Sequence, residues 1–451
     1  MLEWRTAVGA PEGSDVTEGP VNSPGNAPAD SMGAMGAFSI GIGGIVGGGI
    51  FATLGIAANG SRGSTYISFL VGGAIALLTA YSYVHLSLTY PGKGGTVTFI
   101  ERGFGRGLFG SSMNFLLVFS YVVLLAVYAD AFGTYAANFF PVDQRHYWHV
   151  GHRSAVIVLM AVINLLGPSL VDRSEGFFNV GKLGILAAFV IAGLAGSGLT
   201  FSRLGPSYWV PLPKIISSGM AVFLSYEGFE LIANASDRIR NPRRNLPLAF
   251  YGSVVTAIVL YFFIIVVTLG YLSFEALQRA SNYPLSAAAE VFMGRPGFLL
   301  LSVGAILATA SAINAGIFGA SKLPITLAQM GEAGGIWDRE VWQRHPAGLL
   351  YVAACALVIS NVLNLHAMSA AASAGFLLIF ALVNAANARL SQQTASKGWI
   401  SKAGAAACLL ALATLIVQTF REPEHSIEIY CFAALFLLPF VFQIIRRALR
   451  P

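Results

Sequence analysis

Charged residues are scarce in this sequence, and their scarcity limits the classes of protein that it can encode. Asp, Glu, Lys and Arg make up 11% of the 451 residues, whereas an average soluble domain carries roughly 25%. Hydrophobic residues make up 55% of the chain. This composition excludes a disordered chain, a disulfide-rich secreted module and an ordinary cytosolic enzyme. It indicates a protein whose main solvent is lipid.

Cysteine is rare, and basic residues are too scattered to form a patch. The three cysteines, Cys355, Cys408 and Cys431, lie in apolar stretches and lack the spacing of a metal site. We expect small buried side chains there, and neither a metal nor a cofactor. The 27 Lys and Arg residues give a net charge of +6. They form no basic stripe, so we expect no nucleic-acid partner.

The motifs of membrane enzymes and of channels are missing as well. No HExxH sequence occurs, and the polar residues at mid-span form no convincing pair of nucleophile and base. Rings of like residues or re-entrant filter sequences, which ion channels use, are not evident. We therefore predict neither an enzyme nor a channel.

Apolar segments long enough to cross a bilayer, which takes roughly 20 residues per helix, are abundant. Residues 1–35 are instead polar and rich in Pro, Gly, Ser, Asp and Glu, so we expect a disordered tail. Most Lys and Arg residues fall in the loops on the side of the N-terminus. This bias predicts a multi-pass cell-membrane protein with both termini in the cytoplasm. The twelve predicted spans are residues 37–59, 65–90, 109–139, 153–171, 176–198, 215–236, 247–272, 297–321, 347–365, 367–390, 400–420 and 427–447.

Glycines interrupt the first predicted span. Residues 41–51 read GIGGIVGGGIF, and Gly47, Gly48 and Gly49 follow one another at mid-span. Each glycine costs roughly 1 kcal/mol against alanine in a helix, so the backbone can unwind there. A second half-helix that begins at this point would offer free N–H groups to a carboxylate. The alternative is that these glycines, with Gly43, serve only close helix packing.

Two acids interrupt the sixth predicted span. Glu227 and Glu230 lie at mid-span with Gly228 between them, and acids inside a membrane are rare and usually face a cavity. Unwinding at the glycine would expose carbonyls to a cationic group. Interrupted spans at corresponding positions of two halves indicate an inverted repeat with the substrate near the midplane. A solute with both a carboxylate and an ammonium fits this pair, and a free amino acid is the simplest such solute.

Three motifs together resemble the amino acid/polyamine/organocation (APC) transporter superfamily. They are the run at residues 41–51, YPGKGG at 90–95, and SYEGFE followed by NASDRIRNPRRNLPLA across 225–249. Their order and spacing agree over nearly the whole chain after the tail. The sequence is most similar to proton-coupled, sodium-independent amino acid transporters that carry a lysine in the fifth span.

The resemblance implies an all-α membrane protein of the LeuT type, with 12 transmembrane helices and with spans one and six discontinuous. The fold would be a 5+5 inverted repeat. The implied organisation is a tail at residues 1–35, a first repeat at 36–198, a second, inverted repeat at 199–391, and two accessory helices at 392–451.

The resemblance also assigns the substrate contacts. The glycines at 47–49 would supply backbone contacts to the substrate carboxylate, and the main chain around Leu224, Ser225 and Tyr226 would receive the amino group. The side chain of Tyr226 would line the pocket and help to gate it.

Lys182 lies in the fifth predicted span, in the segment FNVGKLGIL. A charged lysine at the middle of a bilayer costs at least ~2.5 kcal/mol. An amine that takes up a proton when water reaches it, and releases it when sealed off, is a proton relay. The alternative is that the side chain snorkels toward the cytoplasmic surface. The resemblance implies that its ammonium contacts the carbonyl of Gly43 and a hydroxyl on span eight, where Ser311 is preferred to Thr309.

Glu227 departs from the family pattern, because similar proteins tend to have an apolar residue there. It would face the substrate ammonium or a second cationic centre, or else point away toward a neighbouring helix or water. Glu230 fits the acidic position of many relatives, and we expect it to order the broken helix or to lie on a proton path. Asp130 is interpreted as a hydrated acid at the outer interface, or as part of the entry path. Residues 272–295 are predicted to form a short lid.

The predicted function is secondary active transport of amino acids across the cytoplasmic membrane by alternating access, coupled to protons and independent of sodium. A zwitterionic amino acid is the first substrate hypothesis. A cationic amino acid or a polyamine is the alternative, supported by Glu227. Exchange in place of symport, and a transporter-like amino acid sensor, fit the sequence as well. Membrane lipid is the other expected partner, and the sequence does not define an oligomeric state.

Overall fold

The computed structural model describes residues 31–92, 94–166, 169–329, 340–341, 345–421 and 426–448. The predicted tail at 1–35 lies almost entirely outside the described residues, and so does Lys93 of the motif at 90–95. In the described part, regular structure is helical apart from two paired two-residue strands, β1 (Glu340–Val341) and β2 (His345–Pro346). The prediction of an all-α protein is confirmed.

Nine helices of the described part are long and apolar enough to cross a membrane. Their bounds are α3 Thr65–Thr89, α5 Leu108–Ala137, α6 Arg145–Leu166, α7 Ser169–Ala195, α9 Pro242–Tyr271, α11 Pro284–Gln329, α13 Leu365–Arg389, α14 Gly398–Arg421 and α15 Ser426–Ala448. The connecting segments include α4 Gly95–Phe104, η1 Val142–Gln144, η2 Ser202–Leu204, η3 Pro206–Tyr208 and α10 Phe274–Arg279. Helix α12 (Ala347–Val362) has 16 residues, fewer than the roughly 20 that a crossing needs. The count of twelve spans therefore stays a prediction.

Two further crossings consist of helices that bend at a break. Helices α1 (Ala34–Ile45) and α2 (Gly49–Ser61) are bent by 44° relative to each other. Helix α8 (Leu212–Ala221) is bent by 59° from the 3₁₀ segments η4 (Phe223–Tyr226) and η5 (Phe229–Arg238) that follow it. These are the first and sixth predicted spans, so the prediction of two discontinuous spans is confirmed. The molecule has the architecture of a LeuT-type membrane protein.

The sixth span leaves the α-helical conformation at Val222, with φ −119° and ψ 15°, and its backbone is interrupted a second time after η4. Glu227 is extended, with φ −67° and ψ 150°, and therefore cannot continue the helix. Gly228 follows with φ 117°, a conformation that glycine adopts at little steric cost. The division of the chain into inverted repeats at 36–198 and 199–391 stays a prediction.

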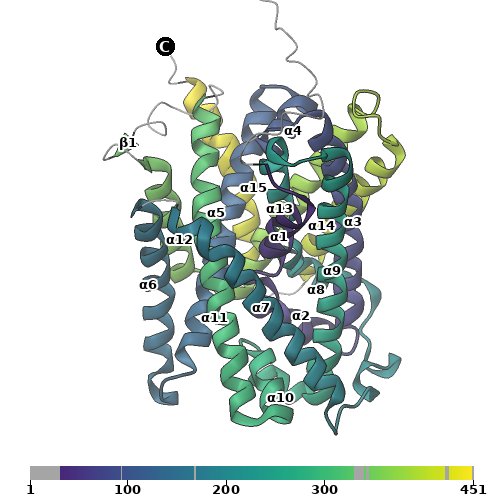
Figure 1. Cartoon of the computed structure of the whole chain (residues 1–451), viewed down its shortest axis with the longest axis vertical. Helices are drawn as coiled ribbons and strands as arrows, with labels where there is room; N and C mark the ends of the chain where they lie inside the picture. Colours follow the sequence, from purple (N-terminus) through teal and green to yellow (C-terminus); the bar gives the residue numbers. More distant parts are fainter. Residues whose placement is uncertain are drawn as a thin grey trace, which may run out of the picture.

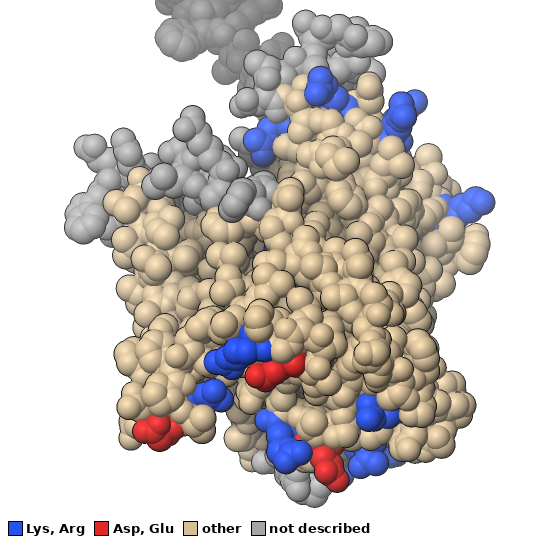
Figure 2. Space-filling view, turned by 60° about the horizontal axis from the view of Figure 1, so that its bottom comes forward, with Lys and Arg blue, Asp and Glu red and all other residues tan. Residues whose placement is uncertain are grey.

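Helices α5 and α13 form the centre of the bundle. In each of them, 89% of an apolar stretch of 18 residues is buried by other parts of the protein. The corresponding share is 28% in α6, α7 and α15. A helix that is apolar all round must be buried in protein or lipid, so the outer helices present their apolar side chains to the bilayer. In Figure 2 the wall of the molecule is mainly free of charge, and acidic side chains gather toward one end.

The two ends of the bundle differ in the segments that they carry. Helix α4 and the C-terminal part of α15 lie toward the upper end in Figure 1, and α10 lies at the lower end. At the start of α1, the N–H of Met32 donates to the carbonyl of Arg238, and the N–H of Arg240 donates to the carbonyl of Met32, both at 2.9 Å. The first described residues are thereby tied to the end of η5.

The segment predicted as a lid contains α10 and the beginning of α11. The residue that separates this part of α11 from its long remainder is Gly294, with φ 65°. The loop before α11 packs closely on α2, since a Cβ on Gly55 would lie 1.7 Å from the carbonyl oxygen of Ser281. Whether these residues move as a lid stays a prediction.

Candidate functional site

The breaks in the first and sixth spans lie directly against each other. A Cβ added to Gly44 would lie 2.7 Å from the Cα of Gly228, closer than atoms can approach. A Cβ added to Gly49 would lie 2.8 Å from the Cα of Ser225. The hydroxyls of Thr53 and Ser225, at 2.7 Å, join the two spans by a hydrogen bond. The glycines therefore serve close packing and chain interruption together, which the sequence had presented as alternatives.

The beginning of α2 supplies backbone donors at this junction. The amide groups of Gly49, Ile50 and Phe51 open the helix, so they have no acceptor within it, and the helix dipole adds partial positive charge there. The N–H of Gly47 instead donates to the carbonyl of Gly44 at 3.2 Å. The N–H of Gly47 is therefore engaged within the first span, and the assignment of the glycines at 47–49 to the substrate carboxylate stays a prediction.

Two carbonyls at the sixth-span break each accept a hydrogen bond from within the protein. The carbonyl of Leu224 accepts the N–H of Glu227 at 3.1 Å, and that of Ser225 accepts the hydroxyl of Tyr261 at 2.9 Å. Each carbonyl oxygen has a second lone pair, which is free to receive an ammonium. The amide of Leu224 receives support from Ser373, whose hydroxyl oxygen accepts its proton at 3.0 Å.

The side chain of Tyr226 contacts α3 and α9. It is 2% exposed, and its hydroxyl donates to the carbonyl of Phe69 in α3 at 2.8 Å. The ring packs against Phe69 and Tyr261, and Tyr226 lines neither of the two cavities described below. The hydroxyl of Tyr226 thus has its hydrogen-bond partner in α3, and the expectation that this side chain lines the substrate pocket stays a prediction.

Tyr261 of α9 connects both breaks through one hydroxyl. Its oxygen lies 2.9 Å from the carbonyl oxygen of Ile45 at the end of α1 and 2.9 Å from that of Ser225 in η4. The side chain is completely buried. Sequence reasoning missed this residue, because a tyrosine in an apolar helix gives no sign of which carbonyls it will meet.

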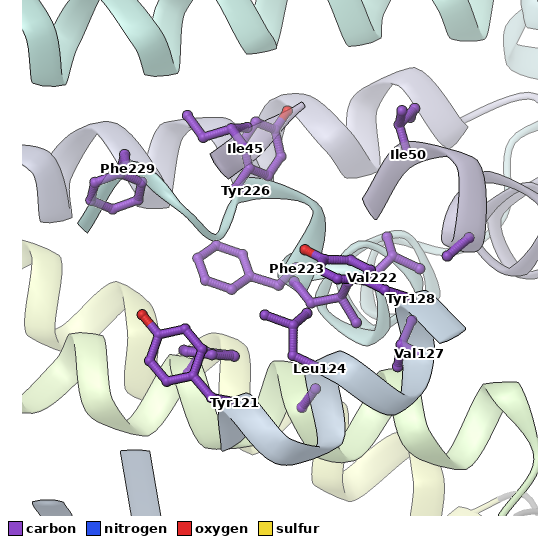
Figure 3. Close-up of a cluster of buried hydrophobic side chains, with 14 of the residues drawn as sticks. Ile45, Ile50, Tyr121, Leu124, Val127, Tyr128, Val222, Phe223, Tyr226 and Phe229 are labelled. Atoms are coloured by element: carbon purple, nitrogen blue, oxygen red, sulfur yellow. The ribbon is translucent and has the colours of Figure 1, made fainter. Parts of the chain in front are cut away.

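An inner cavity of about 100 Å³ lies beside the breaks. Helix α5 forms one wall, and Figure 3 shows Tyr121, Leu124 and Tyr128 of this helix on the side that faces Phe223 and the breaks. Tyr128 also reaches the first break, since a Cβ on Gly48 would lie 2.6 Å from its ring. The cavity is lined by Ser39, Ile40, Gly43, Gly44, Tyr121, Leu124, Leu125, Tyr128, Asn179, Glu227, Gly228, Glu230, Leu231, Ser311, Ala312, Ala315 and Gly316.

The two acids of the sixth span both line this cavity, but only one has partners. The carboxylate of Glu230 accepts the hydroxyl of Tyr121 at 2.7 Å and the N–H of Gly228 at 2.8 Å. Glu230 therefore holds the backbone at the break. Glu227 is 1% exposed, and neither of its carboxylate oxygens has a hydrogen-bond partner among the described residues. The alternative that Glu227 points away and is bonded to a neighbouring helix is excluded for the described part of the chain.

Lys182 of α7 reaches the first break. Its Nζ donates to the carbonyl of Gly43 at 2.7 Å, and the residue is 2% exposed, so the side chain does not snorkel to a surface. Ser311 lines the inner cavity. The hydroxyl of Thr309 donates to the carbonyl of Ala305 at 2.7 Å within its own helix. This places Lys182 on the loosened backbone of α1, as the resemblance implies.

A larger outer cavity of about 710 Å³ lies at the other side of the breaks. It extends from the ends of α2, α5 and α14 to Ala221, the last residue before the sixth span unwinds. Asp130 lines it, but only 5% of this residue is exposed, and Arg153 donates to its Oδ1 at 2.9 Å. The interpretation of Asp130 as a hydrated interfacial acid is wrong, because α6 folds back and places Arg153 and His149 beside it.

No group of three or more metal-ligating side chains occurs in the part of the chain that the structure describes. Backbone N–H groups, backbone carbonyls, one ammonium and two carboxylates surround the junction of two interrupted helices, and a cavity lies on either side of it.

Comparisons with known proteins give the same picture. The family described as amino acid permease matches residues 32–386. The chain is 29% identical to the inner membrane transport protein YbaT of Escherichia coli (strain K12) over 441 residues, which are 95% of this chain and 99% of YbaT. It is 24% identical to the serine/threonine exchanger SteT of Bacillus subtilis (strain 168), over 66% of this chain and 68% of SteT. It is also 24% identical to the mitochondrial cationic amino acid transporter 3 of Arabidopsis thaliana, over 76% of this chain and 59% of that protein.

Proposed function

This chain belongs to the amino acid permease family, and from this premise we propose that it is a secondary active transporter of amino acids, coupled to protons and independent of sodium. It is a multi-pass membrane protein and a transporter rather than an enzyme. The proposal adds the coupling ion, the binding site and the orientation in the membrane.

The observation that carries the proposed coupling is the contact of Lys182 with Gly43 at 2.7 Å. A fixed ammonium at this carbonyl supplies positive charge to the last turn of α1, next to the break, the place that sodium occupies in sodium-coupled relatives of the resembled group. Because Lys182 is buried, its charge is tolerated only while the broken span offers acceptors. Gain and loss of its proton would then be linked to the geometry of the break.

The substrate would lie at the junction of the two breaks. The N–H groups at the start of α2 suit its carboxylate, and the free lone pairs of the carbonyls at Leu224, Ser225 and Tyr226 suit its α-ammonium. The inner cavity is lined by Gly43, Gly44 and Gly228 at the breaks, and the outer cavity reaches Ala221. Rearrangement of α1 and η5 against α5 would open one cavity while closing the other, which is alternating access.

Uptake into proteoliposomes tests this proposal. With an inward proton gradient and no sodium, a panel of labelled amino acids is offered, and we expect accumulation of at least one above its external concentration. Collapse of the gradient with a protonophore should abolish accumulation. Accumulation that requires sodium would contradict the proposed coupling. Binding without any flux would instead favour the sensor, and flux only against an internal amino acid would favour an exchanger.

The proposed location is the cell membrane with both termini in the cytoplasm. The end of η5 and the start of α9 carry four arginines, Arg238, Arg240, Arg243 and Arg244, next to the first described residues of the chain. Basic loops are retained on the cytoplasmic side of membranes, and this cluster would also meet anionic headgroups.

A further inference from the structure

Two carboxylates line the inner cavity three positions apart, and the structure gives them different tasks. Glu230 is occupied, since its oxygens accept the Tyr121 hydroxyl and the Gly228 amide. Glu227 is equally buried but has no donor for either oxygen among the described residues. Glu230 therefore has a structural role at the break, whereas the carboxylate of Glu227 is available to a ligand.

An unpaired carboxylate on a buried residue is a costly arrangement. Removing a carboxylate from water without a compensating partner is strongly unfavourable, and acids inside membranes mark pathways for ions or substrates. A carboxylate with a structural role would accept hydrogen bonds from a hydroxyl or an amide, as that of Glu230 does. Glu227 is instead suited to a partner that arrives from outside and carries positive charge.

The cavity places this carboxylate next to the proposed substrate site. Glu227 directly follows Tyr226, whose carbonyl belongs to the proposed ammonium site. Tyr128 lines the same cavity and lies against Gly48 at the first break. A substrate whose α-groups are held at the junction would thus extend its side chain toward Glu227.

The remaining walls suit a short alkyl chain that ends in a cation. Leu124, Leu125 and Ala312 supply apolar surface, and the rings of Tyr121 and Tyr128 can attract a positive charge at their faces. A cavity of about 100 Å³ has room for a few water-sized groups, and hence for an amino-alkyl chain.

We infer that this transporter selects amino acids whose side chain ends in a second cationic group, such as lysine and ornithine, and that Glu227 is the residue that determines this specificity. The inference rests on the proposed function. An amino acid is favoured over a polyamine, because the N–H groups at the start of α2 are suited to bind a carboxylate, and polyamines have none. The alternative is that Glu227 binds a proton instead of a substrate ammonium. The experiment must distinguish these two roles.

Paired substrates test the inference. Purified protein in proteoliposomes is preloaded with an unlabelled mixture of amino acids, and entry of labelled lysine is compared with that of norleucine, its neutral analogue with a hydrogen in place of the terminal ammonium. Ornithine and norvaline form the second pair. We expect a preference for the cationic member of about tenfold or more, since a buried charged hydrogen bond is lost with the neutral analogue. Glu227→Gln should abolish this preference while the neutral amino acids still enter.

The matched control is Glu230→Gln, which changes the same chemical group in the same cavity. Because Glu230 holds the break, its substitution should slow cationic and neutral substrates alike and leave their ratio unchanged. A second readout is the rise in melting temperature that lysine causes in detergent, which reports binding without transport. This rise should be lost in Glu227→Gln and retained in Glu227→Asp.

Different results overturn different statements. Equal entry of lysine and norleucine in the unmodified protein, or an unchanged ratio in Glu227→Gln, would refute the specificity assigned to Glu227. If Glu227→Gln keeps the ratio of lysine entry to norleucine entry, but its amino acid uptake no longer depends on the proton gradient, Glu227 carries the proton. Failure of every amino acid to enter or to raise the melting temperature would refute the proposed function itself.

Discussion

Gly44 and Gly228 meet backbone to backbone, so that a Cβ on Gly228 would lie 2.3 Å from the carbonyl carbon of Gly44. The two residues belong to the first and sixth spans, and this contact brings the two breaks together. Because both partners are main chain, neither can move aside as a flexible side chain could. The contact therefore sets the geometry on which the amide groups of α2 and the carbonyls of η4 depend.

Gly228→Ala should abolish transport and lower stability. The substitution meets both the backbone of Gly44 and a φ of 117°, and the strained conformation alone costs on the order of 1–3 kcal/mol. We expect a lower melting temperature in detergent and no uptake in proteoliposomes. Gly184→Ala on α7 is the control, because nothing lies within 4 Å of its added Cβ. Normal uptake by Gly228→Ala would mean that the contact does not define the site.

Lys182→Ala should lose proton-driven accumulation while retaining exchange. Removal of the ammonium leaves the Gly43 carbonyl without the donor that it has at 2.7 Å, but it leaves the amides and carbonyls of the substrate site in place. We expect counterflow of labelled amino acid to persist and its dependence on the proton gradient to disappear. Uphill accumulation at the unmodified level in this variant would refute the relay assignment.

Tyr261→Phe should weaken the connection between the two breaks. The variant keeps the ring but removes the hydroxyl that serves the carbonyls of Ile45 and Ser225, at a cost of about 1–3 kcal/mol for buried groups left unpaired. We expect a lower melting temperature and a higher KM for uptake. Tyr271→Phe on the same helix removes a hydroxyl that donates to Gly193, at a distance of 2.9 Å, and should leave the KM unchanged. Identical KM values for both variants would contradict a role for Tyr261 in the site.

Asp130→Asn should destabilise the outer part of the bundle. Its partner Arg153 has only 11% of its side chain exposed, and breaking a buried pair leaves an uncompensated charge that costs about 3–5 kcal/mol. The melting temperature should fall clearly. Glu290→Gln is the comparison, since Glu290 and Arg295 are about half exposed and 3.9 Å apart, and such pairs contribute about 0–1 kcal/mol. Equal effects of the two substitutions would show that Asp130 is hydrated after all.

Labelling of single cysteines should establish the orientation in the membrane. In a variant whose three native cysteines are replaced by alanine, Arg243→Cys and Arg279→Cys place a thiol at exposed positions at opposite ends of the molecule. We expect a membrane-impermeant maleimide to label Arg279→Cys on intact cells. Arg243→Cys should react only after the cells are made permeable. The reverse pattern would place both termini outside.

The sequence by itself determined the class of the protein and which two of its spans are interrupted. Scarce charge and long apolar runs require helices in lipid, because every backbone group must be paired there. The glycines at 47–49 lie just after the end of α1, and Gly228 lies just after the end of η4. The α-helix of the sixth span already ends at Ala221, which the sequence did not indicate. Lys182 and the two acids of the sixth span were visible in the sequence for a similar reason, since charge inside a membrane is rare.

Only the tertiary structure decided which partner each of these groups has. Glu227 and Glu230 look alike in sequence, yet Tyr121 reaches one of them and no described residue bonds the other. Asp130 was expected in water and is paired with Arg153 instead. The periodicity of a helix tells which residues share a face, but it does not give the register of one helix against another. The contacts between residues more than a hundred positions apart, such as Tyr121 and Glu230, arise from that register and from the close approach that the glycines allow.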